Sequence, residues 1–97
     1  MISDRATLET KAKLFGALGD PSRLAVLEAL RGGPRCVSDL VAETGLSQPS
    51  VSGHLASLRR GGLVRREQRG RFAFYSIGSQ TAECVLASAD QLLAGIA

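Results

Sequence analysis

Short hydrogen-bonding side chains are concentrated in residues 47–54, where they alternate with apolar residues at helical spacing. Val51, Leu55 and Leu58 fall at i, i+4 and i+7, so they form one apolar side of a helix that Ser47 can cap. Glutamine can pair with adenine through two hydrogen bonds, and serine can donate or accept at several base edges. The pattern therefore indicates a helix that reads nucleic-acid bases. Its candidate residues are Ser47, Gln48, Pro49, Ser50, Ser52, Gly53 and His54.

Three of these residues need separate interpretation. Pro49 falls in the first turn of the helix, where a missing N–H costs little. Gly53 weakens a helix by about 1 kcal/mol relative to alanine, and it either allows close approach to a DNA groove or leaves one base step unread. His54 lies beside Leu55 at the edge of the apolar side, where a histidine that holds the helix in place is favoured over a ligand.

Arginines crowd the short span that follows, in which Glu67 is the single acid. The net charge of the 97-residue chain is only +3, so the positive charge is local, as expected for a surface that meets double-stranded DNA. A solvated basic surface is the alternative. Arg69 and Arg71 are expected to contact phosphates or the minor groove. For Arg59 and Arg60, pairing with acids is expected as much as contact with DNA. The arginines of this span are Arg59, Arg60, Arg65, Arg66, Arg69 and Arg71.

Two cysteines offer a second kind of chemistry. Cys36 falls at the expected N-cap of a helix, where serine or threonine is usual, and a helix N-terminus favours the thiolate form that binds soft ions. If Cys36 and Cys84 converge, within one chain or across a dimer, they can hold Cd, Pb, Hg or As(III), or form a disulfide as a redox signal. A small, half-buried structural residue is the equal alternative for Cys36.

Four helices are expected before the arginine-rich span. The first covers residues 6–18, and the second starts at Asp20 and Pro21, which suit the N-cap and the first helical position. The third covers about 37–44, and the base-reading helix follows a turn at Gly45. Apolar residues at helical spacing form the inner sides of the first three helices: Leu8, Ala12, Phe15, Leu18, Leu24, Leu27, Leu30, Val37, Leu40 and Val41.

Beyond the fourth helix, residues 63–68 and 71–77 are expected as strands around a turn at Arg69 and Gly70, which makes a basic β-hairpin. A last helix follows a cap at Ser79. Its apolar face comprises Ala82, Val85, Leu86, Ala89, Leu92, Leu93 and Ile96. This face is wider than a terminal helix on a small monomer needs, so the simple explanation is a homodimer interface shared with the first helix. Packing on its own protomer is the alternative.

The fold class expected is mainly α with a small β-hairpin, a winged helix-turn-helix in one domain over residues 1–97. With 4% aromatic residues the core must be aliphatic. No apolar run approaches the roughly 20 residues of a membrane span, and no signal-peptide core is present. The two cysteines lack a disulfide-style spacing, so a cytoplasmic location without a membrane partner is expected. An enzyme is disfavoured, because the chain has one histidine, no evident carboxylate pair and no glycine-rich phosphate loop.

Three motifs in order resemble the ArsR/SmtB family of winged-helix repressors, over about Phe15 to Leu93. Residues 17–24 are similar to the family's Ala-Leu-x-Asp-Pro-x-Arg-Leu entry to its second helix. Residues 47–55 are similar to its recognition helix, and residues 62–75 to its wing. The resemblance implies a homodimer on operator DNA that represses transcription until an inducer, often a metal ion, releases it.

The family's metal sites are matched only in part. Residues 36–40 resemble its thiolate motif Cys-Val-Cys-Asp-Leu, with Ser38 in place of the second thiol. Ser57 and Gly61 stand where another thiol site has cysteines. The positions that match the family's final-helix zinc site hold poor zinc ligands: Ser79, Thr81, Leu92 and Gly95. We therefore expect a repressor that answers to a soft ion at Cys36 and Cys84. The alternatives are a thiol-redox repressor without metal, or a winged-helix protein-interaction module that does not read DNA.

Overall fold

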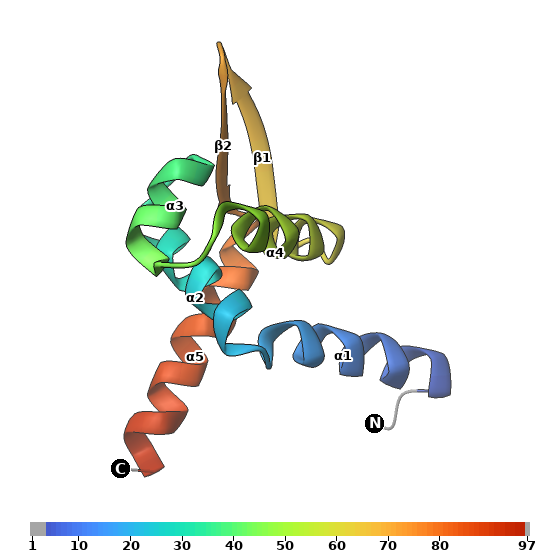
Figure 1. Ribbon diagram of the computed structural model, residues 1–97. Coiled ribbons are helices and arrows are strands. Elements are labelled where there is room, and N and C mark those ends of the chain that lie inside the picture. The colour runs from blue at the N-terminus through green and yellow to red at the C-terminus, as the bar shows by residue number, and fades with distance from the viewer. Residues whose placement is uncertain (1–3, 97) are drawn as a thin grey trace.

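The computed structural model describes residues 4–96, over which five α-helices, one turn of 3-10 helix and an antiparallel hairpin follow one another (Figure 1). The elements are α1 Arg5–Leu18, α2 Pro21–Ala29, η1 Leu30–Gly32, α3 Val37–Thr44, α4 Gln48–Arg60, β1 Val64–Arg69, β2 Phe72–Ile77 and α5 Gln80–Ile96. This is the predicted winged helix-turn-helix. No helix in the described part of the chain is long and apolar enough to cross a membrane.

The helix boundaries follow from local capping. The Asp20 carboxylate accepts a hydrogen bond from the Arg23 N–H at 2.8 Å, and the Ser47 hydroxyl accepts one from the Ser50 N–H at 3.2 Å. Each satisfies one backbone donor that the first turn of a helix leaves open. Gly45 ends α3 at φ 73°, a left-handed conformation that glycine adopts without a steric penalty. The predicted turn between α3 and α4 is therefore confirmed.

The core is aliphatic and lies between α2, α3, α4, the base of the hairpin and the start of α5. Its buried residues are Val26, Leu27, Leu30, Leu40, Val51, Leu55, Leu58, Leu63, Val64, Ala82 and Leu86. The predicted buried side of α4 is confirmed. The predicted stripe of α2 was incomplete, because Val26 is fully buried whereas Leu24 is only partly buried. The short α2 packs against α1, α3 and α4, so more than one of its sides must be apolar.

The hairpin turn lies one residue later than the sequence predicted. Arg69 pairs with Phe72 as the last rung of the ladder, and the turn is formed by Gly70 and Arg71. Gly70 has φ 60°, a positive value that a two-residue hairpin turn requires at its first central position. The prediction placed Arg69 in the turn and was wrong, because here Gly70 takes the first central position, and Arg71, whose φ is not positive, takes the second.

Two backbone contacts fix the hairpin to the helices. Arg35, just before α3, pairs with Tyr75 in β2 through N–H···O hydrogen bonds of 2.9 and 2.8 Å. Gly78, between β2 and α5, donates its N–H to the Leu63 carbonyl at 2.9 Å. A Cβ at Gly78 would lie 2.7 Å from the Gly62 carbonyl oxygen, so only glycine fits there.

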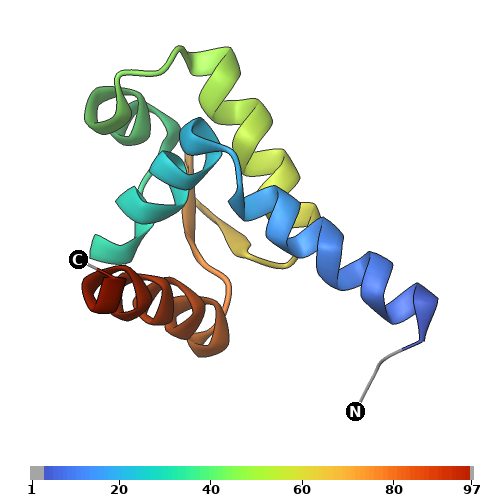
Figure 2. The same ribbon diagram turned by 90° about the horizontal axis from the view of Figure 1, so that it is seen from below.

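The two terminal helices project from the half of the molecule opposite to the hairpin (Figures 1 and 2). Helix α1 contributes no buried residue, and its Phe15 is 65% exposed. Its first turn is capped by Asp4, where hydrogen bonds from Thr7 lower the pKa of the Asp4 carboxyl. Helix α5 follows the predicted cap at Ser79, but most of its predicted apolar face is exposed. The structure therefore leaves apolar surface on both helices.

Candidate nucleic-acid interface

The candidate base-reading residues lie on the outer side of α4 and in its first turns. Gln48, Ser52 and Gly53 are exposed, while Ser50 and His54 are half-buried. The opposite side of α4 is held in the core through the three buried residues predicted for it. This anchoring keeps the polar side of the helix directed away from the protein. His54 is half-buried, and its role in holding the helix stays a prediction.

Some of these residues are already used in forming the helix. The Ser47 hydroxyl accepts the capping hydrogen bond from Ser50, so it remains able to donate to a ligand. Pro49 is exposed at the second helical position, where no intrahelical donor is lost. Around Gly53, a Cβ would meet nothing within 4 Å, so the fold itself does not require glycine there.

The hairpin extends well beyond the helices, with α3 and α4 at its foot (Figure 1). Its residues 65–71 are exposed. Arg69 is held there by an ion pair with Glu67 at 3.1 Å, and its guanidinium lies 5.2 Å from the centre of the Phe74 ring. Arg71 projects from the turn itself. Within residues 4–96, the only ion pair of the arginine-rich span is the one between Arg69 and Glu67.

The arginines at the end of α4 are not neutralised by acids. Arg60 donates a hydrogen bond to the Ser57 hydroxyl at 3.3 Å, and neither Arg59 nor Arg60 forms an ion pair with a carboxylate among the described residues. The described residues therefore give no support to the alternative in which Arg59 and Arg60 pair with acids. Exposed arginines at the end of α4 and in the wing are available to a polyanion, and charge of this kind can bind phosphates without reading sequence.

The two cysteines lie in different surroundings. Cys36 is half-buried at the N-cap of α3, and its sulfur lies 3.1 Å from the Ser38 hydroxyl and 3.2 Å from a carboxylate oxygen of Asp39. Cys84 is exposed on α5, where Gln80 approaches its sulfur at 4.0 Å. Among the described residues, no group of three or more His, Cys, Asp or Glu side chains could hold a metal ion within one chain. The soft-ion site stays a prediction.

Sequence reasoning missed the contact that ties this interface together. The bridge between Arg35 and Tyr75 connects the segment before α3 to the wing. An isolated bridge of one residue pair leaves no periodic pattern in the sequence. The alternation of residues 71–77 gave the only available signal, since it placed Tyr75 in a strand.

Comparison with known proteins agrees with this geometry. A model of the bacterial regulatory proteins of the arsR family matches residues 20–66, which contain α2, α3 and α4. An uncharacterized HTH-type transcriptional regulator of Methanocaldococcus jannaschii is 34% identical over 87% of this chain and 96% of its own length. The transcriptional repressor SdpR of Bacillus subtilis is 32% identical over 68% of this chain and 73% of its own.

The structural neighbours agree. A homodimeric winged helix-turn-helix DNA-binding domain from Mycobacterium bovis, described as a possible ArsR-family regulator, superposes with a TM-score of 0.84. It is 31% identical and covers 98% of this chain and 89% of that one. The chain belongs to the ArsR family. Its members are DNA-binding transcriptional regulators rather than enzymes. The chain spans about half the length of several longer transcriptional regulators that it also matches.

Proposed function

We propose that this ArsR-family protein binds operator DNA as a homodimer and represses transcription until an inducer releases it. One observation carries the proposal: exposed polar side chains of α4 and exposed wing arginines share one half of the molecule, while uncovered apolar faces of α1 and α5 lie in the other (Figure 1). The first half suits a nucleic acid. The second half suits another copy of the chain.

The dimer is supported by an apolar groove between α1 and α5. The groove has a volume of about 610 Å³ and is lined mostly by apolar atoms, including those of Phe15, Leu18, Val85 and Leu92. Helix α1 has 14 residues, and isolated helices of about this length are marginal in water without tertiary packing. A second copy that supplies its own α1 and α5 would cover the groove and stabilise α1, and the M. bovis neighbour is itself described as homodimeric.

A two-fold dimer presents two equivalent recognition helices. Such dimers bind half-sites about one helical turn of DNA apart, or multiples of it, so the operator should be an imperfect palindrome. Within each half-site, Gln48, Ser50 and Ser52 would read bases from the major groove, and Ser47, Gly53 and His54 would lie close to the DNA. Arg69 and Arg71 would meet phosphates or the minor groove on either side.

The test is a binding measurement with duplexes selected from a random pool and with scrambled versions of the selected sequence. Gln48→Ala should reduce the discrimination between selected and scrambled DNA by about 1–3 kcal/mol. Arg71→Ala should weaken binding to both duplexes alike and lower the salt slope by roughly 0.9 for each lost phosphate contact. Fluorescence anisotropy at several salt concentrations measures both effects.

The matched control is Arg5→Ala, which removes another exposed arginine whose partner, Glu9, lies on α1. It should leave discrimination and salt slope unchanged. If neither Gln48→Ala nor Arg71→Ala differs from this control, the assignment of α4 and the wing to DNA reading is wrong. The protein-interaction alternative predicts that result. It is disfavoured because the outer side of α4 carries small polar residues rather than apolar ones.

We further propose that Cys36 belongs to the signal input, through a soft ion or through oxidation. The proposal is supported by the thiol at the N-cap of α3, beside the Ser38 oxygen that replaces the second thiol of the resembling motif. Cys84 of either protomer is the other thiol available. Cys36→Ser should fold and bind DNA but no longer release it on addition of Cd, As(III) or peroxide. Release that persists in this variant would leave Cys36 as an ordinary packing residue.

A further inference from the structure

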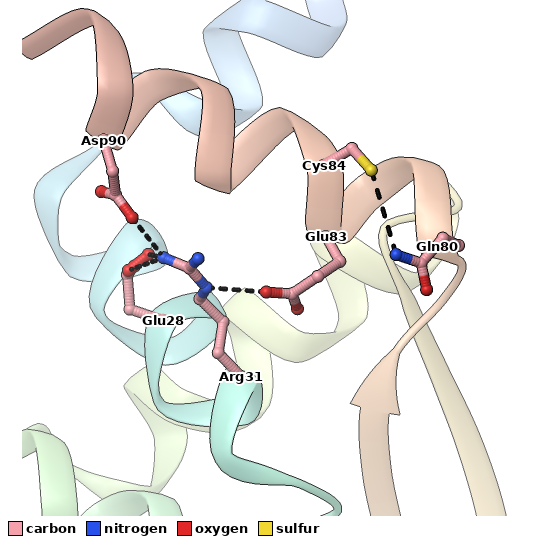
Figure 3. A network of polar contacts seen from close by, with 6 residues as sticks. All are labelled: Glu28, Arg31, Gln80, Glu83, Cys84 and Asp90. Atoms are coloured by element: carbon pink, nitrogen blue, oxygen red, sulfur yellow. Dashed lines mark hydrogen bonds and ion pairs between the residues drawn. The ribbon is translucent and has the colours of Figure 1, made fainter.

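One guanidinium joins the last helix to the winged-helix core. Arg31, in η1, forms ion pairs with Glu28 at 3.0 Å, Glu83 at 2.9 Å and Asp90 at 2.8 Å (Figure 3). Glu28 belongs to α2, whereas Glu83 and Asp90 are two turns apart on α5. The arginine side chain is 25% exposed, and its hydrogen bonds to Asp90, Glu83 and Glu28 raise the pKa of Arg31 above its ordinary value. Arg31 is therefore charged in every relevant state.

The contacts of Arg31 lie on one side of α5, and the open groove lies on the other. Ala82, Leu86 and Asp90 recur every four residues on the side that faces the chain's own core, with Glu83 next to them. The residues that line the groove occupy a different side of the same helix: Thr81, Cys84, Val85, Ser88, Ala89 and Leu92. Helix α5 thus has a side fixed within its own chain and a side left for another molecule.

Asp90 makes the last contact that holds α5 to the core. Leu86 is the last buried residue of the helix, and all the described residues after Asp90 are exposed. At 1.5 Å per residue, Asp90 lies about 12 Å along the axis from Ala82. Two apolar contacts in the first turns locate the start of α5, but they leave its direction free to change. A polar contact one turn further along restricts that direction.

We propose that Arg31 is a positioning residue that sets the direction of α5 relative to α4, and so sets the separation of the two recognition helices. The second step rests on the proposed function, since it requires the dimer and its operator. Loss of the guanidinium would leave the carboxylates of Glu28, Glu83 and Asp90 facing one another. Like charges at this range repel, so a neutral residue at position 31 would drive α5 away from Glu28 of α2 rather than merely loosen it.

The direction of α5 can be measured in a single chain, without DNA. Spin labels are attached to Gly53→Cys on α4 and Gly95→Cys on α5, after replacement of both native cysteines with serine. A Cβ at either glycine meets nothing within 4 Å, so the labels should be tolerated. The labelled chain is diluted into excess unlabelled protein, and pulsed electron paramagnetic resonance gives the distribution of label-to-label distances. Arg31→Gln should broaden this distribution and shift it, whereas Arg31→Lys should partly restore it.

Asp90→Asn provides a second variant that keeps the fold. It removes only the outermost contact, from a side chain that is 61% exposed, and should broaden the distribution in the same way but less. Arg5→Gln, which breaks an exposed ion pair within α1, is the matched control and should change nothing. Circular dichroism checks that each variant is folded. Unchanged distance distributions in both Arg31→Gln and Asp90→Asn would overturn the proposal.

The consequence for DNA is tested with duplexes whose two selected half-sites are separated by spacers that differ by one base pair. Wild-type protein should prefer one spacing. Arg31→Gln should flatten that preference and lose roughly tenfold in affinity at the best spacing, within the 5–150-fold range of couplings between sites. Its affinity for a single half-site should not change. If wild-type protein binds no duplex while the label distances still respond to Arg31→Gln, the operator function fails and the positioning role stands.

Discussion

Two leucines, each on the apolar side of a helix, show how differently the two halves of this molecule use apolar residues. Leu55 on α4 is 1% exposed, and the core closes around it, whereas Leu92 on α5 is 68% exposed and lines an open groove. Both belong to the apolar side of an amphipathic helix. Periodicity therefore indicates which side of a helix avoids water, but not whether the same chain or another molecule covers that side.

The largest effect on stability should come from the buried core around α4. Leu55→Ala should lower the free energy of unfolding by about 2–5 kcal/mol, because it removes buried methyl groups and leaves a cavity that close-packed neighbours fill poorly. Urea unfolding followed by circular dichroism measures the change. A loss below about 1 kcal/mol would mean that the core around α4 is not closed and would remove the contrast with α5.

A smaller loss of stability is expected where backbone segments meet. Gly78→Ala should lower the free energy of unfolding by about 1–3 kcal/mol, since the new methyl group overlaps backbone atoms that cannot rotate away. The close contact is with the Gly62 carbonyl oxygen. Gly95→Ala on the projecting part of α5 is the matched control, because a Cβ there meets open space. Equal stability of the two variants would contradict the tight packing of Gly78 against the backbone of Gly62 and Leu63.

A glycine on the exposed side of α4 should change stability in the opposite direction. Gly53→Ala should raise the free energy of unfolding by about 1 kcal/mol, the difference between the two residues in a helix interior. No protein atom opposes the methyl group. Thermal unfolding measures the gain, and DNA binding by the same variant separates two interpretations of the glycine. Weaker binding would indicate close approach to the groove, and unchanged binding would indicate that this position is not in contact.

The smallest effect on the fold should come from the terminal helices. Leu92→Ser changes an exposed side chain, so the chain's own fold should change by no more than about 0.5 kcal/mol. The association of two chains should weaken instead. Sedimentation at micromolar concentration should give about twice the 10.2 kDa chain mass for the wild type and a lower average mass for the variant. A wild-type protein that stays monomeric would leave the groove without its proposed occupant.

The features that could be predicted from the sequence depend on residues within a turn or two of each other. The caps at Asp20 and Ser47, the left-handed Gly45 and the buried side of α4 all follow from local spacing and were confirmed. The hairpin was also predicted, but its turn was wrong by one residue. Alternation of apolar and polar residues does not fix whether Gly70 takes the first or the second position of the short turn.

Other features depend on residues far apart in the chain. Arg31 is 52 residues from Glu83 and 59 from Asp90, and no pattern in the sequence announces that these charges meet. Val26 was missed for a related reason, because its burial depends on several helices packing around α2. The chemistry of the cysteines was predicted as alternatives, a soft-ion site, a redox pair or a structural residue, since the choice among them depends on whether Cys36 meets a second thiol.

The bridge between Arg35 and Tyr75 has a practical consequence. Tyr75 is the single tyrosine of a chain that has no tryptophan, so its ring gives the tyrosine emission of the whole protein from one point. That point is where the wing meets the segment leading into Cys36 and α3. Fluorescence of the unlabelled protein thus reports on this junction alone. A change in emission on adding DNA, Cd or peroxide, beyond what absorption or quenching by the added ligand causes with free tyrosine, would show that binding alters the junction of α3 and the wing.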